Sequence, residues 1–306
     1  MKIAVLIFCY LRAEKFKATL ECLSKNAGLN NYHFVVYQDG LRQSKDLVEH
    51  ETVKGHWDRF VKKNSIKSTN FFRSEVNLGL RTSIMRGITS TLHEHDGVIV
   101  LEDDLQIHEK FLYNLERLLR DYKDDAKIYH VNGWSPPTFG SSKSNRLVKT
   151  KMMFCWGWGT WSHKWKKFAE KENFEKKDTN NLKAFVGDFM GLAGFRRQLR
   201  LNTQLRIRTW AVYWYWYLFL NRKICIGPRL SLVRNTGNDG SGENCGEIEL
   251  DDKFQSIFNG EVQFNGDTKP PVWYSDLKYT ILVYKWLIMR DAIMIARKIR
   301  NFTFND

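Results

Sequence analysis

Three consecutive acids, Glu102, Asp103 and Asp104, follow directly after the apolar run 98–101 (Val-Ile-Val-Leu). Such a run is typical of a buried strand, and three carboxylates at its end repel one another and are costly to desolvate. A divalent cation offsets both effects. Hard oxygen ligands suit Mn²⁺ or Mg²⁺, and the ion in turn holds a diphosphate. Acids also follow strands as helix caps or solvated turns, but the position after this run favours a metal site.

The elements that position the acids follow a regular alternation. Apolar runs predict strands over residues 2–8, 33–37, 97–101 and 127–132, and helical periodicity covers residues 14–26, 77–93 and 108–122. Alternating strands and helices with short connections predict an α/β fold, with a mostly parallel sheet covered by helices on both faces. Ligands of such sheets gather at the carboxyl ends of the strands. Asp39 and the acid triplet both follow predicted strands, so we expect them at one edge.

The composition of the chain changes at Pro136-Pro137, beyond which it is richer in Trp, Lys and Arg. We expect a nucleotide-sugar-binding half over residues 1–135 and an acceptor-side half of the same domain over residues 136–268. Residues 269–306 form a separate basic, amphipathic helical element. Its segment 279–289 is apolar almost all round and runs into several Lys and Arg residues. This pattern suits a helix lying at a membrane interface, and packing onto the body of the protein is the alternative.

Composition narrows the class of partner. The net charge of +14 indicates an anionic partner or surface, and residues 143–177 alone carry ten Lys or Arg against three Glu. There is no zinc-finger spacing and no aromatic RNA-binding motif, so nucleic acid is not expected. The five cysteines are widely spaced and include no C-x-x-C, which indicates reduced thiols. A solvated basic face is the default explanation of the positive charge, and a surface facing anionic lipid or a lipid-diphosphate acceptor is the alternative. We expect a cytoplasmic protein, and the alternative places it at the inner face of the cell membrane as a peripheral protein.

Seven segments, in order, resemble those of GT-A glycosyltransferases, namely the bacterial family-2-like sugar transferases related to the N-acetylglucosaminyltransferase I branch. The acid triplet corresponds to the D-x-D region of that group, which reads Glu-Asp-Asp in this branch. The segments are Ile3–Arg12, Val35–Gly40, Arg73 with Asn77-Leu-Gly79, Val100–Leu105, Phe154–Trp161, Trp210–Trp214, and Gly227-Pro228 with Ser231–Gly242.

The resemblance implies a GT-A, Rossmann-like fold and metal-dependent, inverting transfer of a hexosyl or N-acetylhexosaminyl group. The donor would be a nucleotide-sugar, namely a UDP-sugar. The acceptor would be a saccharide or lipid-linked saccharide in cell-surface polysaccharide synthesis. By matching position, Asp104 ligates Mn²⁺ or Mg²⁺, with Asp103 as a second metal residue.

The same resemblance assigns residues to the donor. Asp39 is implied to bind the uridine or ribose and Arg12 to neighbour the base or diphosphate. Glu102 and Asp103 would contact sugar and ribose hydroxyls. The motif residues Arg73 and Asn77 also belong to the nucleotide side. Ser241 lies in a glycine-rich loop, residues 237–242, that would close over the diphosphate; a plain turn is the alternative.

Two positions depart from the resemblance. Ala211 stands where the N-acetylglucosaminyltransferase I branch has its catalytic Asp, and Asn244 stands where some relatives have His. Because an inverting transfer needs a proton acceptor, Asp239 is the first candidate base and Glu243 the second.

Five tryptophans are candidates for stacking on a sugar, with core packing as the alternative for each: Trp134, Trp158, Trp161, Trp210 and Trp214. Trp158 is the foremost, since its small neighbours Gly157 and Gly159 would let a ligand approach.

Two rival functions share these features. A sugar nucleotidyltransferase has a similar sheet and metal acids, but its glycine-rich basic loop after the first strand is not matched by Tyr10–Glu14. The second rival is a degenerate GT-A protein that binds nucleotide or glycan without catalysis, a reading prompted by Ala211 and Asn244.

Overall fold

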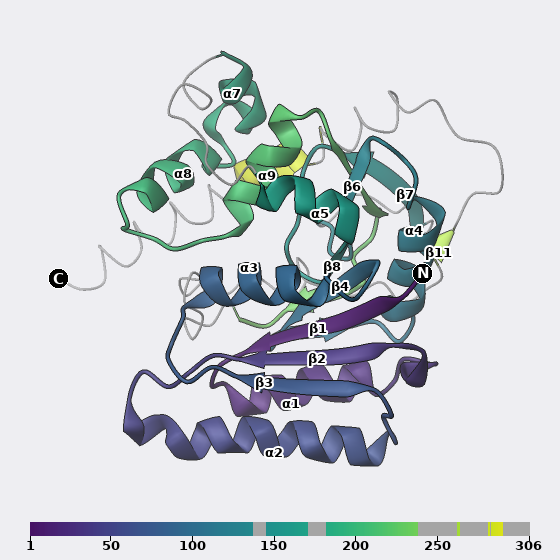
Figure 1. The fold of residues 1–306 in the computed structure, drawn as a ribbon. Coiled ribbons are helices and arrows are strands. Elements are labelled where there is room, and N and C mark those ends of the chain that lie inside the picture. The colour runs from purple at the N-terminus through teal and green to yellow at the C-terminus, as the bar shows by residue number, and fades with distance from the viewer. Residues whose placement is uncertain (137–144, 171–181, 238–261, 264–280, 282, 290–306) are drawn as a thin grey trace.

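The computed structural model describes residues 1–136, 145–170, 182–237, 262–263, 281 and 283–289. A nine-stranded sheet runs through the molecule in the order β11-β7-β9-β6-β8-β4-β1-β2-β3, with helices on both faces (Figure 1). The predicted α/β class with a large, mostly parallel central sheet is confirmed.

The strands are β1 (Ile3–Cys9), β2 (His33–Gln38), β3 (Thr69–Arg73), β4 (Gly97–Glu102), β5 (Leu105–Ile107), β6 (Ile128–Asn132), β7 (Asn145–Thr150), β8 (Trp158–Trp161), β9 (Ile224–Pro228), β10 (Val233–Asn235) and β11 (Val262–Gln263). The helices are α1 (Ala13–Leu23), α2 (Leu47–Lys63), α3 (Leu80–Thr91), α4 (Phe111–Asp121), α5 (Ser162–Ala169), α7 (Leu182–Gly187), α8 (Phe195–Thr203) and α9 (Ala211–Leu220), with short 3-10 turns at η1 (Leu29–Asn31), η2 (Ser44–Asp46) and η3 (Phe189–Gly191).

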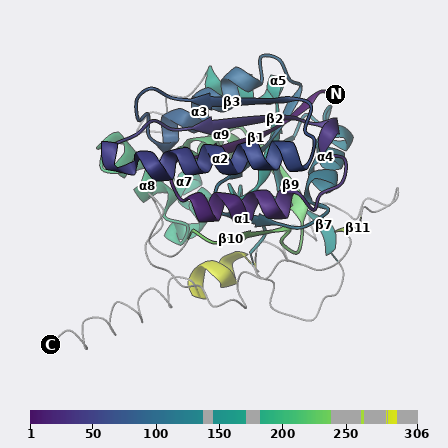
Figure 2. The ribbon, with the colours of Figure 1, turned by 90° about the horizontal axis from the view of Figure 1, so that it is seen from below.

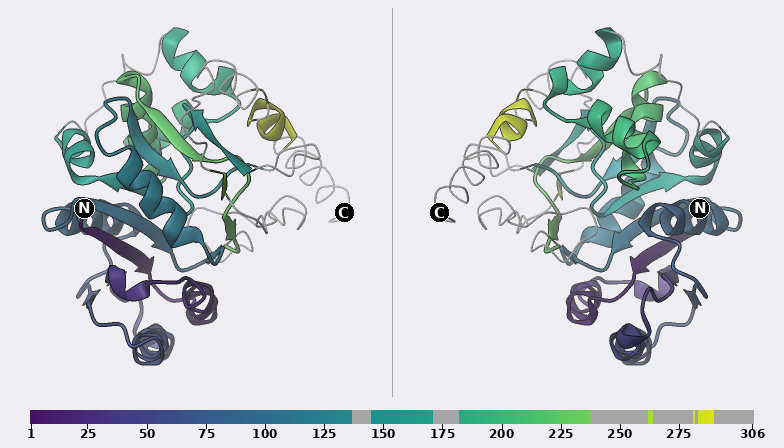
Figure 3. Two further views of the ribbon diagram at one scale, coloured as in Figure 1. Left: turned by 90° about the vertical axis from the view of Figure 1, so that its right-hand side faces the viewer. Right: turned by 90° about the vertical axis from the view of Figure 1, so that its left-hand side faces the viewer.

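Strands β3, β2, β1 and β4 are parallel to one another, and β8 then runs antiparallel between β4 and β6. Strands from both sides of residue 135 therefore lie in one sheet. Figure 3 shows the N-terminal elements, purple to blue, at one end and the green elements of the later chain at the other. The assignment of donor and acceptor roles to the two parts stays a prediction.

The N-terminal part is layered because the inner strands β1 and β4 are apolar on both faces, whereas the edge strand β3 is largely exposed. All seven residues of β1 are buried. Helices α1 and α2 lie side by side on one face of the sheet (Figure 2), where Phe34 of β2 packs against Trp57 and Phe60 of α2. Helix α3 covers the opposite face. Continuous apolar strands are what a sheet covered on both sides requires.

The described part of the C-terminal tail lies against the body. Residues 283–289 are helical (yellow in Figure 3), Val283 and Leu287 are buried, and Trp286 meets Trp134 edge to face at 5.5 Å. Of the two sequence-based alternatives for residues 279–289, packing onto the body therefore holds for this segment. Among the described residues, no helix has the length and apolar character needed to cross a bilayer.

Candidate active site at the carboxyl ends of the parallel strands

The parallel register brings the predicted site segments to one edge of the sheet. Cys9 of β1 pairs with Gln38 of β2, and Phe8 pairs with Glu102 of β4. The residues that follow, namely the turn 10–12, Asp39 and the acids 103–104, consequently leave the sheet at neighbouring strand ends. The expectation that Asp39 and the acid triplet share an edge is met by this register.

Arg12 lies against the acids. Its Nη1 donates to Asp104 Oδ2 at 2.7 Å and its Nε to Asp103 Oδ2 at 3.4 Å, while Nη2 forms an ion pair with Asp103 Oδ1. Arg12 precedes α1 with left-handed backbone angles, φ 43° and ψ 49°, which are uncommon for a non-glycine residue. The contacts to both carboxylates offset the cost of that backbone conformation.

Asp103 ties the β1 turn to β4. Its carboxylate accepts the Tyr10 backbone N–H as well as the Arg12 contacts, and its carbonyl accepts the Thr19 hydroxyl at 2.9 Å. Burial raises the pKa of Asp103, an effect that Arg12 opposes. Burial and the charges of Asp104 and Asp103 also raise the pKa of Glu102. The acids 102–104 thus form a cluster whose two aspartates are bound by the Arg12 guanidinium.

Asp104 meets the chain that follows β10, a contact that sequence reasoning missed. Thr236 donates to the Asp104 carbonyl from both its N–H and its hydroxyl, each at 2.9 Å, and Lys15 Nζ donates to the Thr236 carbonyl at 3.1 Å. Gly237 lies so close that a Cβ there would come within 2.1 Å of Asp104 Oδ2. A side chain at Gly237 would push the Asp104 carboxylate away from its contact with Arg12, so glycine suits this position.

Asp39 holds a loop. Its carboxylate accepts backbone N–H groups from Gly40, Leu78 and Gly79 at 2.8–2.9 Å. Asn77 donates to the Gly40 carbonyl at 2.7 Å and accepts from Arg42 Nε. Both residues thus organise the turns after β2 and before α3 at the site edge. Their predicted contacts with the nucleotide stay predictions.

Arg73 binds two neighbours at the end of β3. Its Nε donates to Gln38 Oε1 at 2.9 Å and its Nη1 to Glu51 Oε1 at 2.6 Å. Gln38 is buried and in turn donates to the carbonyls of Tyr10 and His50. This network joins the ends of β1, β2 and β3, and sequence reasoning missed Gln38 because a lone glutamine at a strand end carries no motif.

Trp158, the foremost candidate for stacking on a sugar, is fully buried in the folded chain, and its contact with a ligand stays a prediction. The ring stacks between His130 at 4.9 Å and Trp210 at 5.1 Å. The flanking glycines serve packing, because a Cβ on Gly157 would meet Val233 and Phe111, and one on Gly159 would meet the Val98 carbonyl. The other candidate tryptophans are buried too: Trp134, Trp161, Trp210 and Trp214.

The candidate bases Asp239 and Glu243 lie outside the described residues, as do Ser241 and Asn244. Ala211 is the first residue of α9 and is partly buried against the core. Its methyl group cannot accept a proton, so the proton acceptor remains a prediction.

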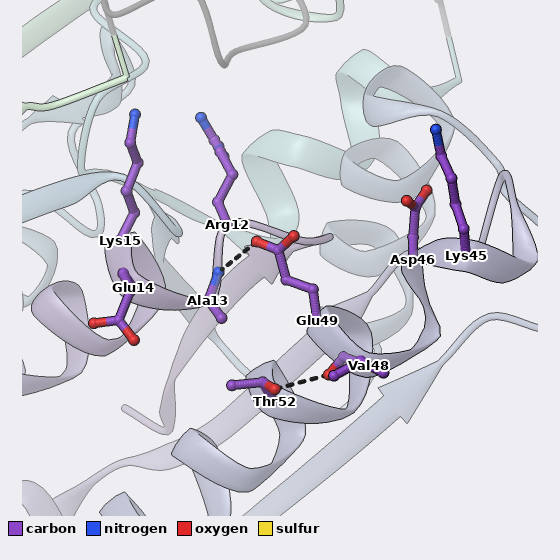
Figure 4. Close-up of a pocket in the computed structure, with 9 residues that line it drawn as sticks. All are labelled: Arg12, Ala13, Glu14, Lys15, Lys45, Asp46, Val48, Glu49 and Thr52. Carbon is purple, nitrogen blue, oxygen red and sulfur yellow. Dashed lines mark hydrogen bonds between the residues drawn. The ribbon is translucent and has the colours of Figure 1, made fainter.

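A cavity of about 570 Å³ lies beside Arg12, where η2 and α2 face the beginning of α1. Figure 4 shows the side chains of Arg12, Lys15 and Lys45 pointing the same way, and Glu49 reaching the Ala13 N–H. The lining residues are Arg12, Ala13, Glu14, Lys15, Lys45, Asp46, Val48, Glu49 and Thr52. Arg12 thus lies between the acid cluster and a cavity lined by both cationic and acidic side chains.

The acid cluster offers a divalent cation few free ligands. Arg12 engages both oxygens of Asp103 and one of Asp104, and Asp104 Oδ1 has no hydrogen-bond partner among the described residues. Over the same residues, no group of three His, Cys, Asp or Glu side chains is arranged to hold a metal. The oxygen donors suit Mg²⁺ or Mn²⁺ in kind, with Asp104 as the ligand and the rest of the shell supplied from outside these residues. For Asp103 to be a ligand, Arg12 would first have to leave it.

Comparison with known protein families gives no match, and neither does comparison with curated proteins. Among solved structures, the chain is similar to a mannosyltransferase from Pyrobaculum calidifontis in complex with GDP-Man and Mn²⁺. The identity is 11%, the TM-score 0.41, and the match covers 63% of this chain and 52% of that one. It is also similar to residues 1–349 of TarS from S. aureus, with 14% identity, TM-score 0.40, and 57% and 50% coverage.

A third similar structure is 4-diphosphocytidyl-2C-methyl-D-erythritol synthase from Anaerococcus prevotii, with 11% identity, TM-score 0.35, and 60% and 81% coverage. The chain spans about half the length of the first two structures. At this distance the similarities assign no activity.

Proposed function

We propose that this protein is a glycosyltransferase that moves a hexosyl or N-acetylhexosaminyl group from a nucleotide-sugar, namely a UDP-sugar, to a saccharide or lipid-linked saccharide. The observation that carries the proposal is the acid triplet at the end of β4, beside the Arg12 turn of β1 and the Asp39 turn of β2. This edge of a parallel sheet is where nucleotide ligands bind in doubly wound folds.

Each group at this edge has a role in the proposed reaction. Asp39 would hold the nucleoside while it fixes the loop 77–79. Asp104 would hold Mn²⁺ or Mg²⁺ with the donor diphosphate, and the chemistry such an ion supplies is neutralisation of the diphosphate leaving group. Arg12, Lys15 and Lys45 would be the partners of the donor phosphates at the cavity, which the carboxylates of Glu14, Asp46 and Glu49 also line.

The proton of the acceptor hydroxyl must leave through a group of this chain or of the acceptor. Asp239 and Glu243 stay the proposed proton acceptors. Gly237 lies next to Asp104, and both residues follow Gly237 in the sequence within six positions. Transfer would proceed with inversion, by direct attack on the anomeric carbon with the proton taken by the base.

The test is thermal stabilisation of the full chain by a panel of nucleotide-sugars with Mn²⁺, repeated with excess EDTA, followed by assay of donor hydrolysis and transfer. Ligands that bind only the folded state raise the melting temperature. Asp104→Asn should lose the metal-dependent shift, while the surface variant Asp58→Asn, on α2, should keep it. Binding without hydrolysis or transfer would favour the degenerate binding protein, and absence of any nucleotide-sugar shift would refute the proposal.

A further inference from the structure

The position of Arg12 relative to the acids raises the question of how a divalent cation would reach them. All three nitrogens of the guanidinium contact the two carboxylates, and 22% of the Arg12 side chain is exposed. Of the four carboxylate oxygens of Asp103 and Asp104, it engages Asp103 Oδ1 and Oδ2 and Asp104 Oδ2.

The Arg12 guanidinium does not lose its charge by deprotonation. Burial lowers the pKa of Arg12, but the charges of Asp103 and Asp104 outweigh that effect and raise it above its already high ordinary value. A guanidinium stays charged at every pH at which the protein is folded. Access to the engaged oxygens therefore requires Arg12 to move, rather than to lose a proton.

We propose that Arg12 and a divalent cation compete for the Asp103–Asp104 carboxylates, so that Arg12 holds the metal affinity of the free protein low. The proposal deepens the proposed function, on which it rests for the identity of the ligand. Mg²⁺ and Mn²⁺ favour about six oxygen ligands, and Arg12 leaves only Asp104 Oδ1 of the two aspartates without a partner among the described residues.

A bound diphosphate would shift the competition between Arg12 and the divalent cation toward the cation. Its oxygens are ligands for the cation and also acceptors for the guanidinium, which already lines the cavity shared with Lys15 and Lys45. Metal and donor would consequently bind together, each weakly alone. Arg12 is in this sense a positioning residue whose partner changes when the ligand arrives.

The test is Mn²⁺ binding to the full chain at pH 8 without nucleotide, measured by calorimetry and by the electron paramagnetic resonance of free Mn²⁺. Arg12→Gln should bind Mn²⁺ about tenfold or more tightly than the wild type, because an adjacent positive charge is removed. Arg12→Lys keeps the charge but cannot bind both carboxylates through several N–H groups at once. It should therefore increase the Mn²⁺ affinity by a smaller factor. Arg120→Gln is the matched control, since Arg120 contacts the Met1 carbonyl at the opposite end of β1.

The site of the gained affinity is checked by combining Arg12→Gln with Asp104→Asn, which should abolish the gain. Equal or weaker Mn²⁺ binding by both Arg12→Gln and Arg12→Lys would overturn the proposal, and so would a gain that survives Asp104→Asn. If Arg12→Gln does not fold, Arg12→Lys alone decides, and wild-type affinity in that variant overturns the proposal.

These outcomes separate the inference from the proposed function. A gain in Mn²⁺ affinity with no nucleotide-sugar binding would support the competition and refute the transferase. Metal-dependent donor binding by the wild type, with no gain in Arg12→Gln, would leave the transferase standing and overturn the competition.

Discussion

The neighbouring acids Asp103 and Asp104 have different surroundings. Asp103 is 2% exposed and its carboxylate is taken up by Arg12 and the Tyr10 N–H, whereas Asp104 keeps one oxygen without a hydrogen bond among the described residues. A carboxylate whose two oxygens are both hydrogen-bonded to protein groups stabilises the fold. A carboxylate with one oxygen that has no hydrogen bond is available to a ligand. The two residues should therefore respond differently to the same substitution.

Asp103→Asn should lower the free energy of unfolding by about 1–3 kcal/mol, because it removes one of the two charged partners of the partly buried Arg12 and leaves Asp104 as the other. Asp104→Asn should change stability less and abolish metal-dependent nucleotide binding and transfer. Chemical denaturation and ligand-induced thermal shifts measure the two effects. Loss of metal-dependent binding in Asp103→Asn with unchanged stability would contradict this division.

The proton acceptor is the second residue-scale prediction. Asp239→Asn should lower kcat by about 10²–10⁴, the usual contribution of general base catalysis, with little change in donor affinity. Steady-state kinetics beside calorimetric donor binding would show whether Asp239 instead holds the nucleotide. If neither quantity changes, Glu243→Gln is the next variant to measure.

At the scale of elements, the tail segment 283–289 acts as part of the core. Its buried face, Val283 and Leu287, packs with Trp286 against the body, while Ile288 on the opposite side is 54% exposed. Removing residues 272–306 is therefore expected to destabilise the protein, rather than only to release it from a membrane.

Leu287→Ala should cost about 2–4 kcal/mol of unfolding free energy, because it leaves a cavity in a packed contact. Ile288→Ala, one residue away on the exposed side, should cost about 0.5 kcal/mol or less. Urea denaturation of the two variants compares them directly. Equal effects would show that the segment does not pack as described.

At the scale of the whole molecule, the buried His130 contributes to the loss of stability in acid. Burial lowers the pKa of His130 from 6.5 to about 3, and its ring is held by the Phe154 carbonyl and the Trp214 indole N–H. Between these two values the unfolded chain binds a proton that the folded chain does not. Stability consequently falls as the pH drops from about 6.5 towards about 3.

One such group contributes at most about 1.4 kcal/mol per pH unit. His130→Gln should flatten the loss of stability between pH 6.5 and pH 4, even if its stability at pH 7 is lower. The exposed His93→Gln should leave the slope unchanged. Denaturation series over this pH range supply the slopes, and identical slopes for His130→Gln and the wild type would refute the assignment.

Parts of the fold with a strong local pattern were predictable. The apolar runs of β1, β2, β4 and β6 and the periodic helix α4 appear close to their predicted bounds. The pair β5 and β10 was not predicted, because three-residue strands carry no period, and their pairing joins Leu105 to Asn235. That pairing places Thr236 and Gly237 against Asp104. Their contacts with Asp104 could not be predicted, because the short strands that bring them together have no recognisable sequence pattern.

The residue pattern alone predicted that the acid triplet ends a buried strand and that Asp39 ends another strand of the same sheet. Both follow from local composition and the geometry of parallel sheets. Three contacts became visible only in the folded chain. Arg12 binds the carboxylates of Asp103 and Asp104, 91 and 92 residues away, and Thr236 binds the Asp104 carbonyl across 132 residues. The Trp158 side chain is buried. The physical reason is that a charge or a ring has the same local pattern whether it meets a ligand or the protein. Its partner is chosen by packing between segments far apart in the chain.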